Sequence, residues 1–336
     1  MTEFILSKEN VLDYFKFQAS PNLPFKVDIN APITFKEIDK FTNVNFLFRV
    51  FFLKRNGNDS SVILKHSQNY VKVKPEIHND VQRNHTEAKA LKRCSEIWGK
   101  GVVPEVYYHD DKHNVNVLQD FGENCLVLAD EFDKGKVHPE ICKILGKRLA
   151  VLHSKTLGKN EILRKTHTIE SVFREYFLNF KMAGSMKVEK KETLKLVNEG
   201  NTAKGALLWG DPVTKNILIS MKGVHFVDFE GAFLWDPAFD LGHMVAHWVL
   251  VYLEKDDLKS QVEISVNIIR EEYKKEMLKR IGKKEIEGIL QRGNNYIGAT
   301  LLHRMVGMSR FKIPKKKAEK VLQTGVELLR SEGSYL

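Results

Sequence analysis

Cysteine and long apolar runs are scarce in this chain of 336 residues. The three cysteines, Cys94, Cys125 and Cys142, are unclustered and odd in number, which excludes a disulfide scaffold or a zinc ribbon and favours a reducing compartment. The most apolar stretch, Met244–Leu253, is interrupted by His247 and is far shorter than the ~20 residues that cross a bilayer. The N-terminal MTEFILSKEN lacks the basic start and apolar core of a secretion signal. We therefore expect a cytoplasmic protein without a membrane segment.

Acidic residues are too few to balance the basic ones: Lys and Arg number 53, Asp and Glu 43, and the net charge is +10. A basic surface suits nucleic acid, anionic lipid or a phosphorylated ligand. The small lysine concentrations at 187–195 and 312–320 include Glu and lie in helix-forming sequence, as on a solvated helix face. No zinc-finger spacing, aromatic RNA-binding motif or helix-turn-helix pattern is present, so we expect no nucleic-acid partner. Nucleic-acid binding stays an alternative, to be tested by salt-dependent filter binding.

The first third of the chain has the composition of a small β-rich region with one helix. Residues 42–53 and 61–65 are rich in Phe, Val, Leu and Ile, and the turn sequence NGND lies between them, which predicts a hairpin. Residues 85–97 have helical composition, and two further strands are expected at 102–109 and 114–118.

The pattern becomes helical after Asp120-Phe121-Gly122. Residues 140–154 carry an apolar stripe at helical spacing, and further helices are expected at 173–182, at 189–198 and from about 240 onward. A strand–loop–strand unit at 206–229 interrupts them. With 43% hydrophobic and 29% charged residues, the composition is that of a globular protein. We predict an α+β fold with a β-rich N-lobe at 1–122 and a larger helical C-lobe at 123–336.

The segment 207–240 holds the strongest chemical signal. Asp211 is followed by Asn216, and then by Asp228 and Glu230 after a second apolar run. Carboxylate and amide oxygens at the ends of short strands suit Mg²⁺, which prefers hard oxygen ligands and substrate phosphates. Phosphoryl transfer also needs a carboxylate that orients the attacking hydroxyl. We predict that Asp211 is that catalytic carboxylate and that the other three residues hold the metal. The alternative is that Asp and Asn merely form turns here.

This segment resembles the catalytic region of the aminoglycoside phosphotransferase and choline kinase group. WGDPVTKN is similar to that group's H-G-D-x-x-x-x-N loop, VDFE to its D-x-D or D-x-E metal motif, and DPAFDLG to the D-P-x-x-D-L stretch that follows. The order and spacing of the three pieces agree. The resemblance implies a protein-kinase-like two-lobed fold and an ATP- and Mg²⁺-dependent enzyme that phosphorylates a hydroxyl of a small molecule.

A kinase-like N-lobe also needs a strand lysine for the nucleotide phosphates and an acidic residue on the next helix to hold it. Lys65 ends the strand-like SVILK, and Glu87 lies on the helix expected after it. The loop that would cover the nucleotide, near 40–45, lacks the glycines that let a backbone approach phosphates. We expect side-chain donors from Thr42, Asn43 or Asn45 to replace them.

Two further site predictions concern adenine and the substrate. Residues 116–120, including Gln119, are expected to form the hinge whose backbone reads adenine. Trp235 is one of several aromatic residues expected either to line the substrate cleft or to pack in the core. LLHRMVG resembles a stretch whose arginine, here Arg304, is implied in substrate binding.

Within the group, the pattern is most similar to methylthioribose kinases. TNVNFLFRV, ILKHSQNYVKVKPE and the D-x-E form of the metal motif carry this resemblance, which implies methylthioribose or a related sugar as substrate and a homodimer as assembly. The sequence departs from the family at Trp209, where the family has His, and at Asn216, where methylthioribose kinases tend to have Ser. A choline-, ethanolamine- or aminoglycoside-type kinase and a nucleotide-binding pseudokinase remain alternatives.

Several polar residues among apolar helical ones are expected to be structural. His243, His247 and His303 are interpreted as packed core histidines. Asp240 is expected to cap a helix that begins at Leu241 and to brace the catalytic loop. A protein kinase is disfavoured, because no A-P-E-like segment is present and the sequence leaves little room for an activation loop.

Overall fold

The computed structural model describes residues 4–40, 42, 44–159, 190–306, 313–330 and 334–335. The chain forms two compact units: unit 1 comprises Met1–Cys125 and Ile219–Gly231, and unit 2 comprises Leu126–Leu218 and Ala232–Leu336. The lobe boundary between residues 122 and 123 stays a prediction. Residues 219–231, which the sequence analysis assigned to the C-lobe, pack with unit 1 in the structure.

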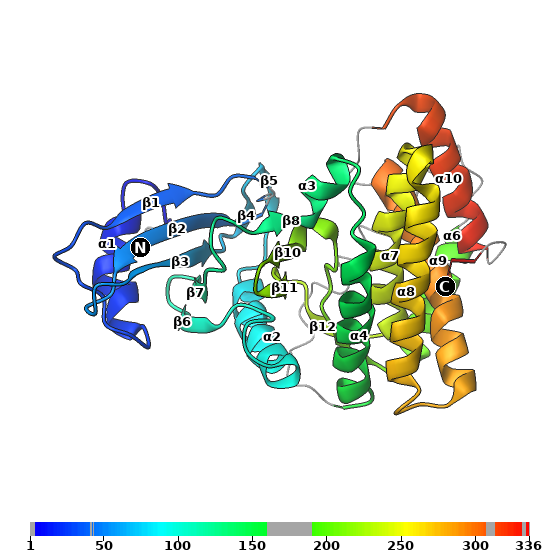
Figure 1. The fold of residues 1–336 in the computed structure, drawn as a ribbon, viewed down its shortest axis with the longest axis horizontal. Coiled ribbons are helices and arrows are strands. Elements are labelled where there is room, and N and C mark those ends of the chain that lie inside the picture. Colours follow the sequence, from blue (N-terminus) through cyan, green and yellow to red (C-terminus); the bar gives the residue numbers. More distant parts are fainter. Residues whose placement is uncertain are drawn as a thin grey trace. The chain divides into compact units, whose positions relative to one another are not determined.

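Unit 1 is built on a five-stranded antiparallel sheet with the order β1-β2-β3-β7-β6 (Figure 1). Its strands are β1 (Thr34–Glu37), β2 (Phe46–Leu53), β3 (Asp59–His66), β6 (Val106–Asp110) and β7 (Val115–Gln119). The hairpin predicted around the NGND turn is β2–β3. The two later strands are also present, although β6 starts four residues after the predicted position.

The two faces of this sheet have different partners because successive side chains alternate along a strand. On one face, residues such as Val62, Leu64 and Val117 join a hydrophobic core with Leu6 and Phe15 from the N-terminal segment. On the other face, Lys65 on β3 lies opposite Asn116 on β7, and Asn116 lies opposite His109 on β6. A row of polar residues therefore crosses three strands of the sheet.

Helix α2 (Gln82–Trp98), the long helix among the described residues of unit 1, follows the sheet's first three strands and contacts Asn116 and Lys65 of the polar row. Its last residue is followed by Gly99, whose φ of 86° is a conformation that glycine adopts without strain. The remaining short elements of unit 1 are α1 (Val11–Tyr14) with helical turns to Asn22, β4 (Tyr70–Val71), β5 (Lys74–His78) and β11 (Gly223–Phe226). Strand β10 (Ile217–Ser220) spans the point where the chain passes from unit 2 to unit 1.

Unit 2 is mainly helical (Figure 1). Its helices are α3 (Leu128–Asp133), α4 (Pro139–Thr156), α6 (Lys190–Thr202), α7 (Pro237–Glu254), α8 (Lys259–Met277), α9 (Lys283–Val306) and α10 (Lys315–Leu329). Its strands are β8 (Leu126–Val127), β9 (Ala206–Leu208) and β12 (Phe233–Trp235), of which β9 and β12 pair antiparallel. The helix predicted at 173–182 lies outside the described residues.

Helix α7 forms the centre of unit 2, because nearly all of its residues are buried and it packs against α8 and α9. The crossing with α9 depends on Gly242, where a Cβ atom would collide with the backbone oxygen of Gly293. Among the described helices, none is long and apolar enough to cross a membrane. The predicted α+β class, with a β-rich first region and a mainly helical second region, is confirmed.

Candidate active site

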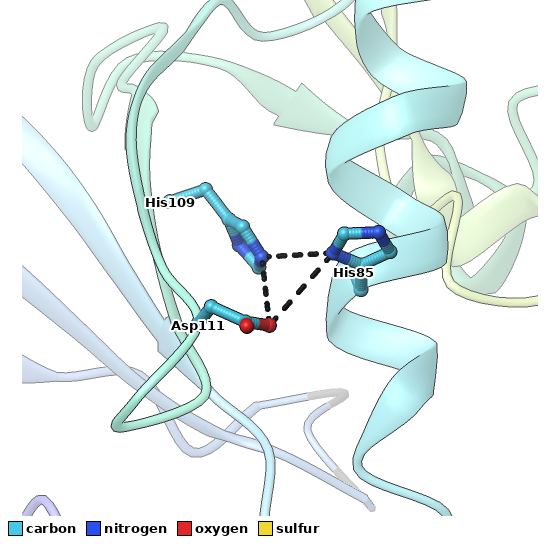
Figure 2. A group of neighbouring side chains, drawn as sticks. All are labelled: His85, His109 and Asp111. Atoms are coloured by element: carbon cyan, nitrogen blue, oxygen red, sulfur yellow. Dashed lines mark hydrogen bonds and ion pairs between the residues drawn. The ribbon is translucent and has the colours of Figure 1, made fainter.

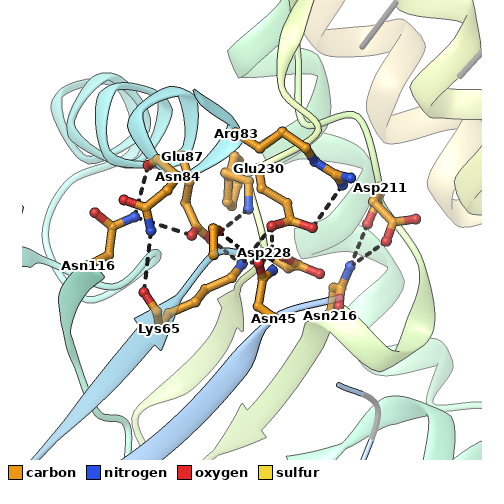
Figure 3. Close-up of polar contacts among 12 residues, drawn as sticks. Asn45, Lys65, Arg83, Asn84, Glu87, Asn116, Asp211, Asn216, Asp228 and Glu230 are labelled. Carbon is orange, nitrogen blue, oxygen red and sulfur yellow. Dashed lines mark hydrogen bonds and ion pairs between the residues drawn. The ribbon is translucent and has the colours of Figure 1, made fainter. Parts of the chain in front are cut away.

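A buried lysine surrounded by carboxylates is the main polar feature of unit 1 (Figure 3). The Lys65 Nζ atom lies 2.8 Å from Glu87 Oε1 and 2.5 Å from Asp228 Oδ1. It also lies 3.7 Å from Glu230 Oε2. The Lys65 side chain is only 5% exposed. The structure thus brings together three carboxylates that are distant in sequence around one ammonium group.

The charges of this cluster depend on one another. Burial lowers the pKa of the Lys65 ammonium, but the attraction of the three carboxylates outweighs it, so the pKa is raised. Burial raises the pKa of Glu87, and the positive charge of Lys65 opposes this change only in part. Lys65 and the Arg83 guanidinium, which pairs with Glu230, face three carboxylates, so the cluster keeps one excess negative charge when all three are ionised. Such a site favours the addition of a cation.

Helix α2 and strand β7 hold Glu87 in place. Glu87 Oε1 accepts a hydrogen bond from the backbone N–H of Phe229 at 3.2 Å, and Glu87 Oε2 accepts one from the amide of Asn116 at 3.4 Å. The same Asn116 amide donates to the backbone oxygen of Asn84 at 2.9 Å. The Asn84 amide in turn donates to the backbone oxygen of Lys65 at 3.3 Å. Helix and sheet are therefore joined around the Lys65–Glu87 pair.

Asp228 has an unusual backbone conformation, with φ at 66°. This left-handed region is costly for most residues other than Gly, although Asp and Asn visit it more often than others. Its side chain is 25% exposed, more than the other three charged groups of the cluster. Strained backbone conformations cluster at functional sites, and they persist only where the surrounding structure holds them. The conformation places one carboxylate oxygen on Lys65 while the side chain keeps contact with solvent.

Glu230 is held by two neighbours besides Lys65. Its Oε1 atom accepts a hydrogen bond from Arg83 Nη2 at 2.8 Å, and its Oε2 atom accepts one from Asn45 Nδ2 at 2.5 Å. The amide oxygen of Asn45, Oδ1, accepts a hydrogen bond from the Ser67 hydroxyl at 2.8 Å. Asn45 is thus buried and committed to positioning Glu230, whereas the sequence analysis expected it to donate to phosphates.

Three other residues were predicted to bind the nucleotide, namely Thr42, Asn43 and Gln119. The Thr42 hydroxyl bonds to the backbone oxygens of Ile38 and Asp39, both at 2.9 Å, so it stabilises a turn. Asn43 lies outside the described residues. Gln119 is the last residue of β7, and its backbone N–H donates to the oxygen of Glu105 at 2.8 Å. The binding roles of these three residues stay predictions.

In unit 2, Asp211 follows strand β9 and lies on a loop that Asn216 closes (Figure 3). The Asn216 amide donates to the backbone oxygen of Asp211 at 2.9 Å and to its Oδ2 atom at 3.0 Å. Lys215 Nζ lies 3.4 Å from the same Oδ2 atom. The Asp211 side chain is 29% exposed, so its carboxylate is both oriented and accessible. The amide nitrogen of Asn216 donates to Asp211, so its amide oxygen is the atom that would bind the predicted metal.

Asp240 braces the start of this loop from helix α7. Its carboxylate accepts hydrogen bonds from the backbone N–H groups of Trp209, at 2.6 Å, and Gly210, at 3.0 Å. Trp209 supplies this contact through its backbone N–H, so any residue except proline could make it there. The predicted capping role of Asp240 is wrong, because α7 begins four residues earlier than expected. Its cap is Asp236, whose side chain accepts from the N–H of Ala238.

His243, expected to be a core histidine, is also close to the loop that carries Asp211. It is buried, and its Nε2 atom lies 3.7 Å from Asp211 Oδ1. Burial lowers the pKa of His243 to about 3, so the ring is neutral at physiological pH. The sequence places it one helical turn after Asp240, on the same side of α7. This spacing is the signal by which both residues could have been assigned to the loop.

The two predicted substrate residues are largely buried. Arg304 Nη2 lies 3.3 Å from His247 Nε2, and its charge contributes to the lowered pKa of His243. Trp235 is 6% exposed, donates its ring N–H to Asn201 at 3.0 Å and packs against other aromatic rings. Arg304 is therefore in the neighbourhood of the Asp211 loop, while Trp235 has the surroundings of a core residue. Their substrate roles stay predictions.

The sequence analysis missed Arg83 in unit 1. It contacts Glu230, and it precedes Glu87 by four residues on α2. Residues four apart share a helix face, so the position of Glu87 could have indicated Arg83. The donor chemistry of the site agrees with a hard cation, since Asp228 and Glu230 supply carboxylate oxygens in unit 1.

Known proteins resemble this chain in sequence and in fold. No family model matches the chain. Methylthioribose kinase from Exiguobacterium sibiricum is 25% identical over 261 residues, which cover 69% of this chain and 65% of that kinase. The chain thus matches less than two thirds of that relative's length.

Solved structures share the fold. Choline kinase from Cryptosporidium parvum Iowa II has a TM-score of 0.56 at 11% identity, covering 97% of this chain and 95% of the other. Amicoumacin kinase, in complex with AMP-PNP, Ca²⁺ and Ami, has a TM-score of 0.53 at 12% identity, covering 98% and 95%. The chain therefore has the protein-kinase-like fold of these two kinases and is similar in sequence to methylthioribose kinases, as the motif analysis predicted.

Proposed function

We propose that this chain is an ATP- and Mg²⁺-dependent kinase that transfers the γ-phosphate to a hydroxyl group of a small metabolite. The observation that carries the proposal is the buried Lys65 ammonium, paired with Glu87 from α2 and with Asp228. Kinases of this type need a strand lysine, its helix glutamate and a metal-binding aspartate in place together. The similarity to named small-molecule kinases supports the same conclusion.

The residues of unit 1 would bind the nucleotide phosphates. Lys65 holds its charge at all physiological pH values, so it offers a permanent donor to phosphate oxygens. Glu87 fixes the direction of the ammonium, and Asp228 and Glu230 supply oxygen ligands for Mg²⁺. Bound Mg²⁺ would neutralise phosphate charge during transfer. Arg83 and Asn45 keep the Glu230 carboxylate in a defined orientation.

Asp211 in unit 2 would receive the hydroxyl of the substrate. Its carboxylate is fixed by Asn216 and accessible, as required of a group that orients a hydroxyl and accepts its proton. The neutral ring of His243 borders the other carboxylate oxygen. Positioning and charge neutralisation, rather than covalent chemistry, would supply most of the rate acceleration.

Methylthioribose or a related sugar is the substrate that we propose first, because the relative reported above is named a methylthioribose kinase. A net charge of +10 disfavours polycationic aminoglycosides, since like charges slow their encounter. Arg304 and Trp235 are the proposed substrate residues. Choline- and ethanolamine-type substrates are the main alternatives, because the fold also occurs in choline kinase.

The test is ADP release from Mg·ATP in the presence of methylthioribose, other sugars, choline, ethanolamine and aminoglycosides. We expect one class of hydroxyl compound to stimulate turnover in wild type and not in Asp211→Ala. Asp257→Ala is the matched control, because Asp257 is an exposed aspartate of the same unit. ATP binding without stimulation by any hydroxyl compound would favour a nucleotide-binding pseudokinase and refute the proposed transfer.

Two finer proposals concern location and assembly. All three cysteines are free thiols, which agrees with a reducing, cytoplasmic environment. The homodimer rests on the resemblance to methylthioribose kinases alone and stays a prediction.

A further inference from the structure

A second polar cluster in unit 1 includes His109, the β6 end of the row that crosses the sheet. Figure 2 shows its three side chains. It consists of His85 on helix α2, His109 on strand β6 and Asp111 in the turn after that strand. His85 Nδ1 lies 3.2 Å from His109 Nε2. Asp111 Oδ1 lies 3.9 Å from His85 Nδ1 and 3.7 Å from His109 Nε2. Two imidazole nitrogens and one carboxylate oxygen thus face a common point.

The spacing of these three atoms fits a transition-metal ion. The point that is equidistant from the three atoms and lies in their plane is about 2.1 Å from each of them. This distance is close to the usual Zn–N and Zn–O bond lengths. Imidazole and carboxylate ligands suit Zn²⁺, whereas Mg²⁺ prefers oxygen ligands alone. Three protein ligands also leave room for water to complete the coordination.

The orientation of His109 supports this interpretation. His109 Nδ1 lies 2.7 Å from Asn116 Oδ1, an amide oxygen that can only accept a hydrogen bond. The proton of the neutral ring is therefore on Nδ1, and the lone pair on Nε2 points at His85 and Asp111. Metal-binding histidines are commonly fixed in this way by a hydrogen bond to the second ring nitrogen. Asn116 is fully buried, so this orientation is part of the folded sheet.

We propose that His85, His109 and Asp111 form a Zn²⁺ site that fastens strand β6 and its following turn to helix α2. The site is distinct from the proposed Mg²⁺ residues, and it does not depend on the proposed kinase activity. Asn116, which orients His109, also contacts Glu87 through its amide nitrogen. The zinc ion would therefore stabilise the helix that carries the partner of Lys65.

The access of solvent to the site permits exchange with free metal. The side chain of Asp111 is 79% exposed and that of His85 is 37% exposed. The same exposure makes both residues suitable for substitution, because neither contributes to the hydrophobic core. In metal-free protein, the two rings would share a hydrogen bond, and this is the competing explanation of their short contact.

The experiment is calorimetric titration of the full chain, without an affinity tag and after removal of metal by a chelator, with zinc chloride. We expect saturable binding of one Zn²⁺ per chain, weakened at least tenfold in both His85→Ala and Asp111→Asn. His78→Ala is the control and should bind as wild type does, since His78 is exposed on β5. Circular dichroism checks that each variant is folded.

Two results would overturn the proposal. The first is the absence of saturable zinc binding in wild type, which would leave the histidine pair as a hydrogen bond only. The second is undiminished zinc binding in either His85→Ala or Asp111→Asn. Neither result bears on ATP turnover, so the zinc site and the proposed kinase function can fail independently.

Discussion

Replacing Lys65 with Met tests the electrostatic account of the unit 1 cluster. The substitution keeps the apolar stem of the side chain but removes the charge that holds three carboxylates together. Glu87 is almost completely buried, so water cannot replace the ammonium there, whereas Glu230 keeps its ion pair with Arg83. Loss of one partner of a buried ion pair costs about 3–5 kcal/mol, because the remaining charges are left uncompensated. We expect a loss of folding free energy in this range.

Glu87→Gln is the informative comparison. Glutamine keeps an oxygen that can accept from Lys65 and from the backbone N–H of Phe229, and Lys65 keeps its other two carboxylates. We expect a smaller loss of about 1–2 kcal/mol, the range for a weakened charged hydrogen bond. The loss of stability in the Lys65→Met/Glu87→Gln double variant should be smaller than the sum of the two single losses, since the double variant lacks one of the repelling carboxylates.

The loss of stability in Lys65→Met should depend on pH in a definite direction. Burial already raises the pKa of Glu87, and without Lys65 it would rise further, because the positive charge that opposes the increase is gone. A carboxylate with a raised pKa in the folded state favours folding at low pH, and this contribution is lost as the pH rises through its folded pKa. The stability gap between wild type and Lys65→Met should therefore be smaller at pH 5 than at pH 8.

Urea denaturation followed by circular dichroism measures all three variants at both pH values. A Lys65→Met loss no larger than that of Glu87→Gln would refute the reasoning. So would a gap that widens as the pH falls. Either result would mean that the three carboxylates do not depend on Lys65 for their compensation.

Other regions of the chain give further predictions. Burial lowers the pKa of four histidines, namely His66, His243, His247 and His303. Because the unfolded chain binds their protons more readily, each should reduce stability by up to about 1.4 kcal/mol per pH unit as the pH falls below 6.5, visible as a falling urea midpoint between pH 7 and pH 5. Gly242→Ala should cost about 1–3 kcal/mol through the collision with α9, whereas Gly282→Ala, where a Cβ meets nothing within 4 Å, should be close to neutral in thermal unfolding. Asp240→Asn should lower stability by about 1.5–3 kcal/mol in the same assay, because two backbone N–H groups lose a charged acceptor; unchanged stability would contradict its bracing role.

The fold and some of the contacts among the candidate site residues could be predicted, because local patterns and motif spacing indicate them. The apolar runs around the NGND turn specify the β2–β3 hairpin whatever the rest of the chain does. Lys65 and Glu87 were assigned from their order along the chain, and the structure pairs them at 2.8 Å. Asp211 and Asn216 were assigned from a motif with fixed spacing, and a loop of that length brings them into contact.

Contacts that depend on the neighbouring elements could not be read in the same way. Asn45 was expected to reach phosphates, but its amide is committed to Glu230, a residue 185 positions later in the chain. Asp240 was expected to cap a helix that begins at Leu241. The helix α7 begins four residues earlier, at Pro237, and its cap is Asp236. His243 was correctly expected to be buried, but its closeness to Asp211 was missed, although its spacing of one helical turn from Asp240 carries that signal.

The most direct measurement of the proposed function is phosphorus NMR of a reaction with Mg·ATP and the stimulating hydroxyl compound. We predict a new phosphomonoester signal that grows in equal amount with ADP in wild type. In Asp211→Asn, whose carboxylate can no longer accept the hydroxyl proton, we predict that this signal is absent although ATP still binds. A phosphomonoester formed at an undiminished rate by Asp211→Asn, or ADP formed with inorganic phosphate alone in wild type, would contradict the proposal.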